Sequence, residues 1–467
     1  MKLSPSELLH ITHDEFCNIG KLKGEMLRGV STDSRTIREG ELFVALRGTT
    51  YDGHRFLADA FARGALAAVV ARDGLIEPVK TMPLLVVPDT TNALGELARY
   101  YRLKFSIPVL AIGGSNGKTT TKDMIAAVLG RRFKVLSTEG NLNNQIGVPH
   151  TLFRLDKKHD IAVIEIGTNH PGEIAYLCGI VEPTHGLITN IGREHLEFFR
   201  SLGGVAKEEG ALFEKLARNG GTAFVNVDDV HLRRRSQKIK SKVTYGFSSR
   251  TATVRGRLGA MDAAGCVELH FVSKRLKRET RVKLAIPGKH SAANALAAAA
   301  VGLTFHVPAA EIKFALEYIQ PVNKRMEILT INGITVYNDT YNANPDSMRA
   351  ALQTLAAAQV SGKRIAVLAD MNELGAASET EHTRIGKEII SLQIDYLLTF
   401  GDQAQYIYEA ANMKFKCHYQ HKNMLAEYLS ELLAPGDAVL VKGSRSMKME
   451  DVVVFLQERL KQTKAPA

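Results

Sequence analysis

The sequence contains no tryptophan, and its four cysteines are scattered without a CxxC pair. This spacing is typical of reduced thiols in a cytoplasmic protein. No stretch approaches the ~20 consecutive apolar residues that a membrane span needs, and the start of the chain carries acidic residues where a secretory signal has an apolar core. These absences predict a cytoplasmic protein without membrane insertion.

Acidic residues are outnumbered by basic ones, and the formal net charge is +11. Two basic runs, His231–Lys242 and Ser273–Lys283, raise the alternative of a nucleic-acid-dependent ATPase. Neither run interleaves aromatic residues, and no nucleic-acid-binding motif is present. Solvated faces on a protein with polyphosphate ligands are the better interpretation. We therefore expect no nucleic-acid partner.

The length of 467 residues predicts about three domains at ~100–200 residues each. We expect an α/β protein with a small α/β domain over residues 1–105, a central parallel-sheet domain over 106–321 and a Rossmann-like α/β domain over 322–467. From Pro108 on, short apolar runs end in Gly, Asn or Asp, which indicates parallel strands with ligands at their carboxyl ends. Between Thr251 and Ile286 a period of two predicts antiparallel strands.

A glycine-rich loop, AIGGSNGKTTTKDM at Ala111–Met124, joins an apolar run to a helical pattern. The common P-loop has a glycine five positions before its second glycine, but Ile112 stands there. The physical requirements survive, because glycines and a helix N-terminus turn backbone N–H groups toward an anion. The alternative is a simple turn with a surface lysine. The loop predicts a P-loop ATPase domain whose phosphate site is formed by Gly114, Ser115, Asn116, Gly117, Lys118, Thr119 and Thr120.

Two further polar residues follow apolar strands and could open at the same sheet edge. Glu165 ends VIEIG, and His195 lies in TNIGREHL. A nucleotide-bound Mg²⁺ needs oxygen or imidazole ligands beyond the threonine hydroxyl. Each residue alone would be explained by a structural hydrogen bond, whereas together with the loop they favour a metal site.

These elements together resemble the Mur ligase family, the ATP-dependent amide-bond ligases of peptidoglycan precursor synthesis, over essentially the whole chain. Ser291 stands where the family usually has Asn, and the His that often precedes Arg325 is missing. The matching motifs are the GGSNGKTTT loop, Glu165–Gly167, Asn190–Leu196, Gly288–Ala298 and Lys324–Glu327.

Four more stretches resemble the branch of the family that adds D-Ala-D-Ala to a UDP-MurNAc-tripeptide. The resemblance implies that ATP phosphorylates the terminal carboxylate of the tripeptide and that the dipeptide amine attacks the acyl phosphate. A sister ligase and a nucleotide-binding scaffold without ligase chemistry are the alternatives. The stretches are Gly140–Pro149, Asn338–Met348, Ala369–Gly375 and Lys442–Glu450, with Asn338 in place of a usual acid.

The resemblance also implies roles at the reacting phosphate. Lys118 and Arg325 would supply positive charge, and Thr119 with Glu165 would hold one Mg²⁺. His195 and a CO₂-derived carbamate on Lys207 would hold a second. Without the resemblance, Lys207 is an ordinary surface lysine beside Glu208 and Glu209.

The remaining implied roles concern substrates. Three substrates meeting between three domains predict closure of the third domain, with a hinge near Pro321–Glu327, in a monomer. A capped turn is the alternative for the UDP residues. The implied contacts are Asn294 with adenine, Asp339 with ribose, Ser34 and Arg35 with UDP, Asn141, Asn143 and Asn144 with the muramoyl-peptide, and Asn342, Asn344, Ser444 and Arg445 with the dipeptide.

Overall fold

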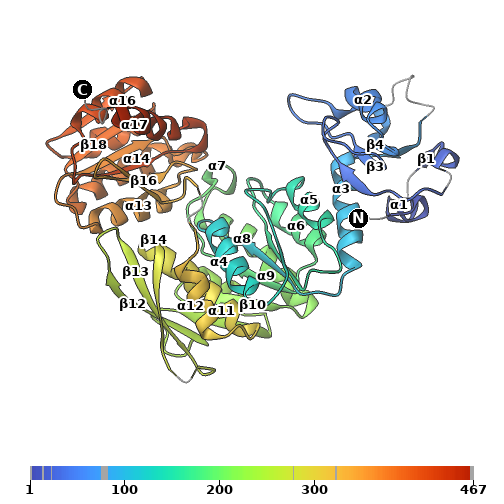
Figure 1. The fold of residues 1–467 in the computed structure, drawn as a ribbon, viewed down its shortest axis with the longest axis horizontal. Helices are drawn as coiled ribbons and strands as arrows, with labels where there is room; N and C mark the ends of the chain where they lie inside the picture. Colours follow the sequence, from blue (N-terminus) through green and yellow to red (C-terminus); the bar gives the residue numbers. More distant parts are fainter. Residues whose placement is uncertain are drawn as a thin grey trace.

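The computed structural model describes residues 3–12, 15–22, 24–74, 82–276, 278–320 and 323–462. The chain forms three α/β lobes in an arc, with the first and third on opposite sides of the central one (Figure 1). Within the described residues each lobe is built on its own sheet, of five, nine and six strands in chain order. The α/β class with three domains is confirmed. The exact domain limits stay a prediction.

The first lobe is a small sheet with the strand order β1-β5-β4-β3-β2, parallel except for β1. Its central strand reads AAVVA and is buried at every position, as expected for a parallel strand covered on both faces. The strands are β1 (Glu15–Cys17), β2 (Gly29–Ser31), β3 (Glu41–Val44), β4 (Ala67–Ala71) and β5 (Leu84–Val87), and the helices are α1 (Pro5–Thr12), α2 (Leu57–Ala62) and α3 (Thr90–Leu103).

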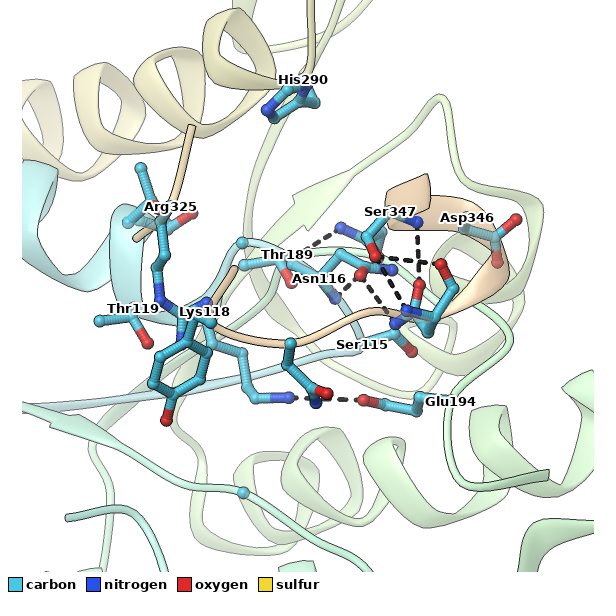
Figure 2. A pocket seen from close by; sticks show the side chains of 18 of the residues that line it. Ser115, Asn116, Lys118, Thr119, Thr189, Glu194, His290, Arg325, Asp346 and Ser347 are labelled. Carbon is cyan, nitrogen blue, oxygen red and sulfur yellow. Dashed lines mark hydrogen bonds and ion pairs between the residues drawn. The ribbon is translucent and has the colours of Figure 1, made fainter. Parts of the chain in front are cut away.

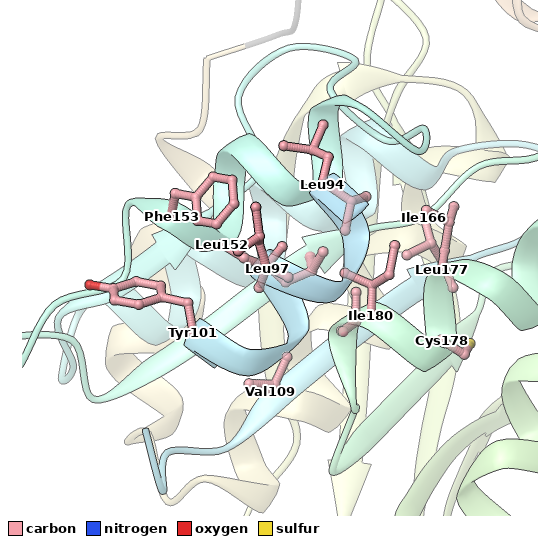
Figure 3. Close-up of a cluster of buried hydrophobic side chains, with 14 of the residues drawn as sticks. Leu94, Leu97, Tyr101, Val109, Leu152, Phe153, Ile166, Leu177, Cys178 and Ile180 are labelled. Atoms are coloured by element: carbon pink, nitrogen blue, oxygen red, sulfur yellow. The ribbon is translucent and has the colours of Figure 1, made fainter. Parts of the chain in front are cut away.

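Helix α3 ties the first lobe to the central one. Asp89 caps its start by accepting a hydrogen bond from the Asn92 N–H. Its apolar face, with Leu94, Leu97 and Tyr101, packs against α5 (Gly147–Phe153) and α6 (Glu173–Val181) of the central lobe (Figure 3). The first sheet therefore sits on a core that it shares with the central lobe.

The central sheet has the strand order β14-β13-β12-β11-β10-β9-β6-β8-β7. Strands β6 to β12 pair in parallel and β12 to β14 pair antiparallel, so both sequence predictions are confirmed. The strands are β6 (Val109–Gly113), β7 (Val135–Ser137), β8 (Ile161–Glu165), β9 (His185–Ile188), β10 (Thr222–Asn226), β11 (Ser241–Gly246), β12 (Val254–Met261), β13 (Cys266–Ser273) and β14 (Thr280–Pro287).

Helices cover both faces of this sheet (Figure 1). The alanine-rich helix α11 is buried along most of its length and packs in one hydrophobic cluster with α4. Small side chains let these two helices approach closely, which brings Asn294 to the phosphate loop. The helices are α4 (Lys118–Gly130), α7 (Leu196–Phe199), α8 (Leu202–Glu209), α9 (Ala211–Asn219), α10 (Val230–Arg235), α11 (Lys289–Thr304) and α12 (Ala309–Glu317).

The third lobe is a sheet of order β15-β16-β20-β17-β18-β19, parallel except for β15. Its first helix begins with a capping box between Asn344 and Ser347 and a proline at N1. The elements are β15 (Glu327–Ile331), β16 (Ile334–Asp339), β17 (Arg364–Ala369), β18 (Tyr396–Phe400), β19 (Lys416–Tyr419), β20 (Ala438–Lys442), α13 (Pro345–Ala357), α14 (Ser378–Ile389), α15 (Ala404–Ala410), α16 (Lys422–Leu432) and α17 (Glu450–Gln462).

The third lobe contacts the central one on two sides of the connecting segment. Arg193 pairs with Asp346 at 2.9 Å and with Glu381 at 3.2 Å. On β16, the Tyr337 hydroxyl donates to the Ala264 carbonyl in the turn between β12 and β13 at 3.0 Å. Of the predicted hinge, residues 321–322 lie outside the described residues. Closure about this hinge stays a prediction.

Candidate active site

A cavity of about 850 Å³ lies where the central and third lobes meet. It is lined by loops that follow the carboxyl ends of β6, β8, β9 and β16. Parallel α/β folds bind their ligands at this edge of the sheet. Most of the predicted site residues line it. These are Ser115, Asn116, Gly117, Lys118, Thr119, Thr120, Asn141, Asn143, Asn144, Glu165, His195, Asn294, Arg325, Asp339, Asn342, Asn344 and Arg445.

The phosphate loop has a backbone that only glycine adopts without strain at two positions. Gly114 and Gly117 have φ of +111° and +77°. A Cβ on Gly117 would lie 2.8 Å from the Asn294 side-chain oxygen, and one on Gly114 would collide with Thr189. The loop is also tied to the segment after β9, because Asn190 Nδ2 donates to the Asn116 carbonyl at 2.9 Å. The loop is thus held in place before any ligand arrives.

Lys118 is a partly buried cation at the start of α4, with 15 % of its side chain exposed. Its Nζ donates to the Gly114 carbonyl at 2.5 Å and lies 3.5 Å from Glu194 Oε2; Figure 2 shows this pair facing each other in the cavity. Burial lowers the pKa of the ammonium, but the negative charges of nearby carboxylates outweigh burial and raise it. Lys118 therefore brings a permanent positive charge to the cavity.

Glu209, at the end of α8, stands behind the phosphate loop and was not predicted. Its Oε2 accepts a hydrogen bond from the Gly114 N–H at 2.7 Å, and the residue is fully buried. Burial, together with the negative charge of Glu194, raises the pKa of this carboxyl to about 8. A neutral carboxylic acid at this place limits the negative charge around the loop.

Glu165 and Thr119 lie together, as predicted. The Thr119 hydroxyl donates to Glu165 Oε1 at 3.2 Å, and Asn143 Nδ2 donates to the same oxygen at 2.8 Å. Glu165 is 1 % exposed, and its Oε2 is buried without a hydrogen-bond partner in the described part of the chain. Leaving a buried carboxylate oxygen unpaired is costly, so this atom points to a missing cation or donor.

His195 lies just before α7 and faces the third lobe. Its Nδ1 is 2.6 Å from Oε2 of Glu373, in the loop after β17. The imidazole holds the pKa of the Glu373 carboxyl below its usual range. Glu373 lies within a stretch that the sequence singled out, but its pairing with His195 was not predicted.

Two side chains that line the cavity from the third lobe are held in place, one by a cation–π contact and one by an ion pair. The Arg325 guanidinium stacks on the Tyr341 ring at 3.9 Å from its centroid. Asp339 Oδ2 is 2.5 Å from Nζ of the buried Lys442, at the end of β20. Lys442 was not predicted as a site residue, although it opens the Lys442–Glu450 stretch. His290, also unpredicted, lines the cavity from α11 and carries a pKa lowered by burial (Figure 2).

Five predicted residues do not line the cavity. Gly114 contributes its carbonyl to Lys118 instead, and Ser444 is buried, where its hydroxyl accepts from the Asn372 N–H at 2.7 Å. Ser34 and Arg35 lie in the first lobe, in the capped turn considered as the alternative, with the Arg35 guanidinium bound to Asp33. Lys207 is exposed.

The position of Lys207 has a simple cause in helix α8. Side chains two residues apart on an α-helix project in nearly opposite directions, because each residue turns the helix by about 100°. Glu209 and Ala206 face the core, and Lys207 consequently faces solvent. The carbamate on Lys207 therefore stays a prediction that the geometry does not support.

A glycine loop with a partly buried lysine and a carboxylate beside a threonine hydroxyl line a nucleotide-sized cavity, and together with three family matches they define an ATP-dependent, amide-bond-forming ligase. Three family models match successive parts of the chain. They are the Mur ligase family, catalytic domain, at residues 27–102, the Mur ligase middle domain at 112–302 and the Mur ligase, glutamate ligase domain, at 324–445.

Relatives match along nearly the full length. UDP-N-acetylmuramoyl-tripeptide–D-alanyl-D-alanine ligase of Escherichia coli is 39 % identical over 97 % of this chain and 99 % of its own, and that of Bacillus subtilis is 35 % identical over 93 % and 94 %. Crystal structure I of MurF from Acinetobacter baumannii is 30 % identical, with a TM-score of 0.88 over 98 % and 99 % of the two chains. MurF ligase from Thermotoga maritima in complex with ADP has a TM-score of 0.83 at 26 % identity, over 94 % and 99 %. The chain belongs to the Mur ligase family.

Proposed function

We propose that this chain joins D-Ala-D-Ala to a UDP-MurNAc-tripeptide, with ATP converted to ADP and phosphate, in peptidoglycan precursor synthesis. The observation that carries the proposal is the shared cavity. The phosphate loop with Lys118 lines it from the central lobe, and the Asn338–Met348 stretch lines it from the third. Relatives named for this reaction share the full length of the chain.

The phosphate loop fits a nucleoside triphosphate. The glycine backbone at 113–117 and the N-terminus of α4 present N–H groups to an anion, and a side chain at Gly117 would close the approach to Asn294. Asn294 would contact the adenine and Asp339 the ribose. Lys118 and Arg325 would face the β- and γ-phosphates, because both are cations that line the cavity.

The residues present also fit a divalent cation bound with the nucleotide. Thr119 and Glu165 would hold Mg²⁺, since the unpartnered Oε2 of Glu165 is a hard oxygen ligand of the kind that Mg²⁺ prefers. His195 would contact a second ion beside the acceptor carboxylate. Mg²⁺ neutralises the charge that collects on the transferred phosphoryl group. No group of three or more acidic, His or Cys side chains in the described residues could hold a metal alone, and phosphate oxygens are the expected further ligands.

The chemistry follows from charge and proximity. A terminal carboxylate oxygen of the tripeptide attacks the γ-phosphorus, and ADP leaves with the bond electrons. The dipeptide amine then attacks the carbonyl carbon of the acyl phosphate, loses a proton, and the tetrahedral adduct expels phosphate. Both partners of the first step are anions, so Lys118 and Arg325 lower its barrier by placing positive charge where negative charge gathers.

The muramoyl-peptide and the dipeptide would enter the cavity from different sides. Asn141, Asn143 and Asn144 line the cavity near Glu165 and suit the muramoyl-peptide. The UDP moiety would extend toward Ser34 and Arg35 of the first lobe. Asn342, Asn344 and Arg445 would receive the dipeptide, whose carboxylate suits a guanidinium, and Ser444 would shape this subsite from behind through the Ala343 carbonyl.

A carbamate on Lys207 is not needed for this proposal. The cavity already contains the carboxylate of Glu194, which is 5 % exposed and has one oxygen without a hydrogen-bond partner in the described residues. Lys207 lies on the solvent side of α8. We therefore place the acidic groups of the site on Glu165 and Glu194.

The proposal includes a cytoplasmic location and a monomeric state. None of the helices in the described ranges has the length and apolar character of a membrane span. The substrates and ATP are expected on the cytoplasmic side, and the residues that line the cavity come from the central and third lobes of one chain. No nucleic acid has a role in the reaction.

Phosphate release with purified protein tests the function. ATP and Mg²⁺ are supplied with UDP-MurNAc-tripeptide and D-Ala-D-Ala, and each peptide substrate is omitted in turn. We expect release only with both, together with a product mass increased by the dipeptide less water. Release with a single amino acid in place of the dipeptide would move the chain to a sister ligase, and release with neither would leave only a phosphate-binding loop.

A further inference from the structure

His195 and Glu373 meet at the boundary between the central and third lobes. The imidazole Nδ1 is 2.6 Å from the carboxylate Oε2, an ion-pair contact without the geometry of a hydrogen bond, and both residues line the cavity. His195 precedes α7, whereas Glu373 follows β17, so the pair forms only when the two lobes are together. The contact is thus a direct link between lobe docking and the site.

Both partners have an unusual backbone. His195 has φ of +47° and Glu373 has φ of +62°, in the left-handed region that non-glycine residues rarely occupy. Such strained residues persist only where the surrounding structure holds them, and they concentrate at functional sites. Here the same conformation occurs on both sides of one contact, which aims the two side chains at each other.

The backbones around the pair are also joined. The Glu197 N–H donates to the Glu373 carbonyl at 3.1 Å. A Cβ on Gly375 would lie 3.0 Å from the Glu197 Cα, so the chain there approaches α7 closely. The backbone of Glu373 is therefore fixed against α7, although 46 % of its side chain is exposed.

We propose that Glu373 is a positioning residue for His195, supplied by the third lobe. The negative charge of a carboxylate beside Nδ1 favours the proton on that nitrogen, which leaves the Nε2 lone pair available to a cation. The cation-binding form of His195 is then assembled only when the third lobe docks. This inference rests on the proposed function, because it takes His195 as a ligand of the second cation.

The test replaces the carboxylate and measures cation binding with and without turnover. Glu373→Ala and Glu373→Gln are compared with Glu379→Gln, which removes an exposed carboxylate from the first turn of α14. Loss of a carboxylate that orients a metal-binding His lowers metal affinity by about 10- to 100-fold. We expect the Mg²⁺ concentration for half-maximal rate to rise by about this factor in Glu373→Ala, less in Glu373→Gln, and not in the control.

A second readout needs no reaction. Mn²⁺ binding in the presence of a non-hydrolysable ATP analogue, followed by electron paramagnetic resonance, should weaken in Glu373→Ala in the same proportion. In a His195→Ala background, Glu373→Ala should add no further loss, since a positioning residue acts only through its partner. Thermal melting of each variant reports any change in folding.

Two results would overturn the inference. One is an unchanged Mg²⁺ and Mn²⁺ dependence in folded Glu373→Ala. The other is an equal loss from Glu373→Ala in the presence and absence of His195. Failure of the proposed function has a different signature, because the wild-type protein would then release no phosphate with both substrates while the Mn²⁺ measurement still reported on the pair.

Discussion

Asn344 Nδ2 donates a hydrogen bond to Asn116 Oδ1 at 2.9 Å, joining the first turn of α13 in the third lobe to the phosphate loop. The same Asn344 side chain accepts from the Ser347 N–H and so caps the helix. The Asn344 side chain therefore caps α13 and also binds the phosphate loop.

The Asn344→Asp variant separates these two roles. Asp caps a helix as well as Asn, but it has no N–H to give to Asn116. A net hydrogen bond contributes about 1 kcal/mol, so we expect kcat/KM for ATP to fall about fivefold with a nearly unchanged melting temperature. Small-angle scattering should record a larger radius of gyration. Asn344→Ala, which loses the cap as well, should also lower the melting temperature, and a wild-type kcat/KM in Asn344→Asp would contradict the linking role.

Lys118→Met is expected to abolish most of the activity. The methionine keeps the length of the side chain but removes the partly buried positive charge near Glu194, Glu209 and Glu165. Loss of one preorganised electrostatic contact typically costs about 10²–10³ in kcat. Phosphate release measures the effect. Lys134→Met, at an exposed lysine beyond α4, should stay within about twofold of wild type, and a similar loss in both variants would show that Lys118 has no special role.

The raised pKa of Glu209 predicts a pH dependence of stability. The folded-state pKa of about 8 lies above the ordinary value of 4.5. The contribution is then fully present below pH 4.5 and is lost as pH rises through about 8, because folding must keep a carboxylate buried beside Glu194. We expect the melting temperature to fall between about pH 5 and 8 more steeply in the wild type than in Glu209→Gln.

Gln suits this comparison because its side-chain oxygen can still accept from the Gly114 N–H while carrying no charge. Glu214→Gln, at an exposed position of α9, should keep the wild-type slope. Equal slopes in the wild type and Glu209→Gln would mean that Glu209 titrates as an ordinary carboxyl.

Lys207 should be dispensable. Its side chain is exposed on α8 and does not line the cavity. We expect Lys207→Met to change kcat/KM by less than about twofold, as for most surface substitutions, and removal of CO₂ and hydrogen carbonate from the assay to leave the rate unchanged. A large loss in the variant, or restoration of activity by hydrogen carbonate, would establish the carbamate instead.

Much of the central lobe could be predicted because its strands are covered on both faces. Strands such as VLAIG and IAVIE are buried at all positions and read as continuous apolar runs. Strands β15 and β19 were not predicted. They are edge strands of the third sheet, with mostly half-buried side chains, so they carry neither an apolar run nor a clear alternation.

Site residues could be predicted where they stand in or next to a sequence motif of known chemistry. Lys118, Thr119 and Glu165 stand in or next to recognisable motifs, and the structure brings them together. Glu209 and Glu373 depend on which helix face is buried and on which lobe docks where. The residues KEE at 207–209 offer three candidates, and only packing decides that Lys207 faces water and Glu209 faces the loop.

The hydrogen bond from Tyr337 to the turn between β12 and β13 has a mechanical consequence. The third lobe is joined to the central one by the chain before β15 and, separately, by this turn, whose Ala263 carbonyl also accepts from the Gln359 N–H at 3.0 Å. Two attachment points define a line. The predicted closure of the third lobe would then be a rotation about the line that joins the connecting segment to the antiparallel extension of the central sheet.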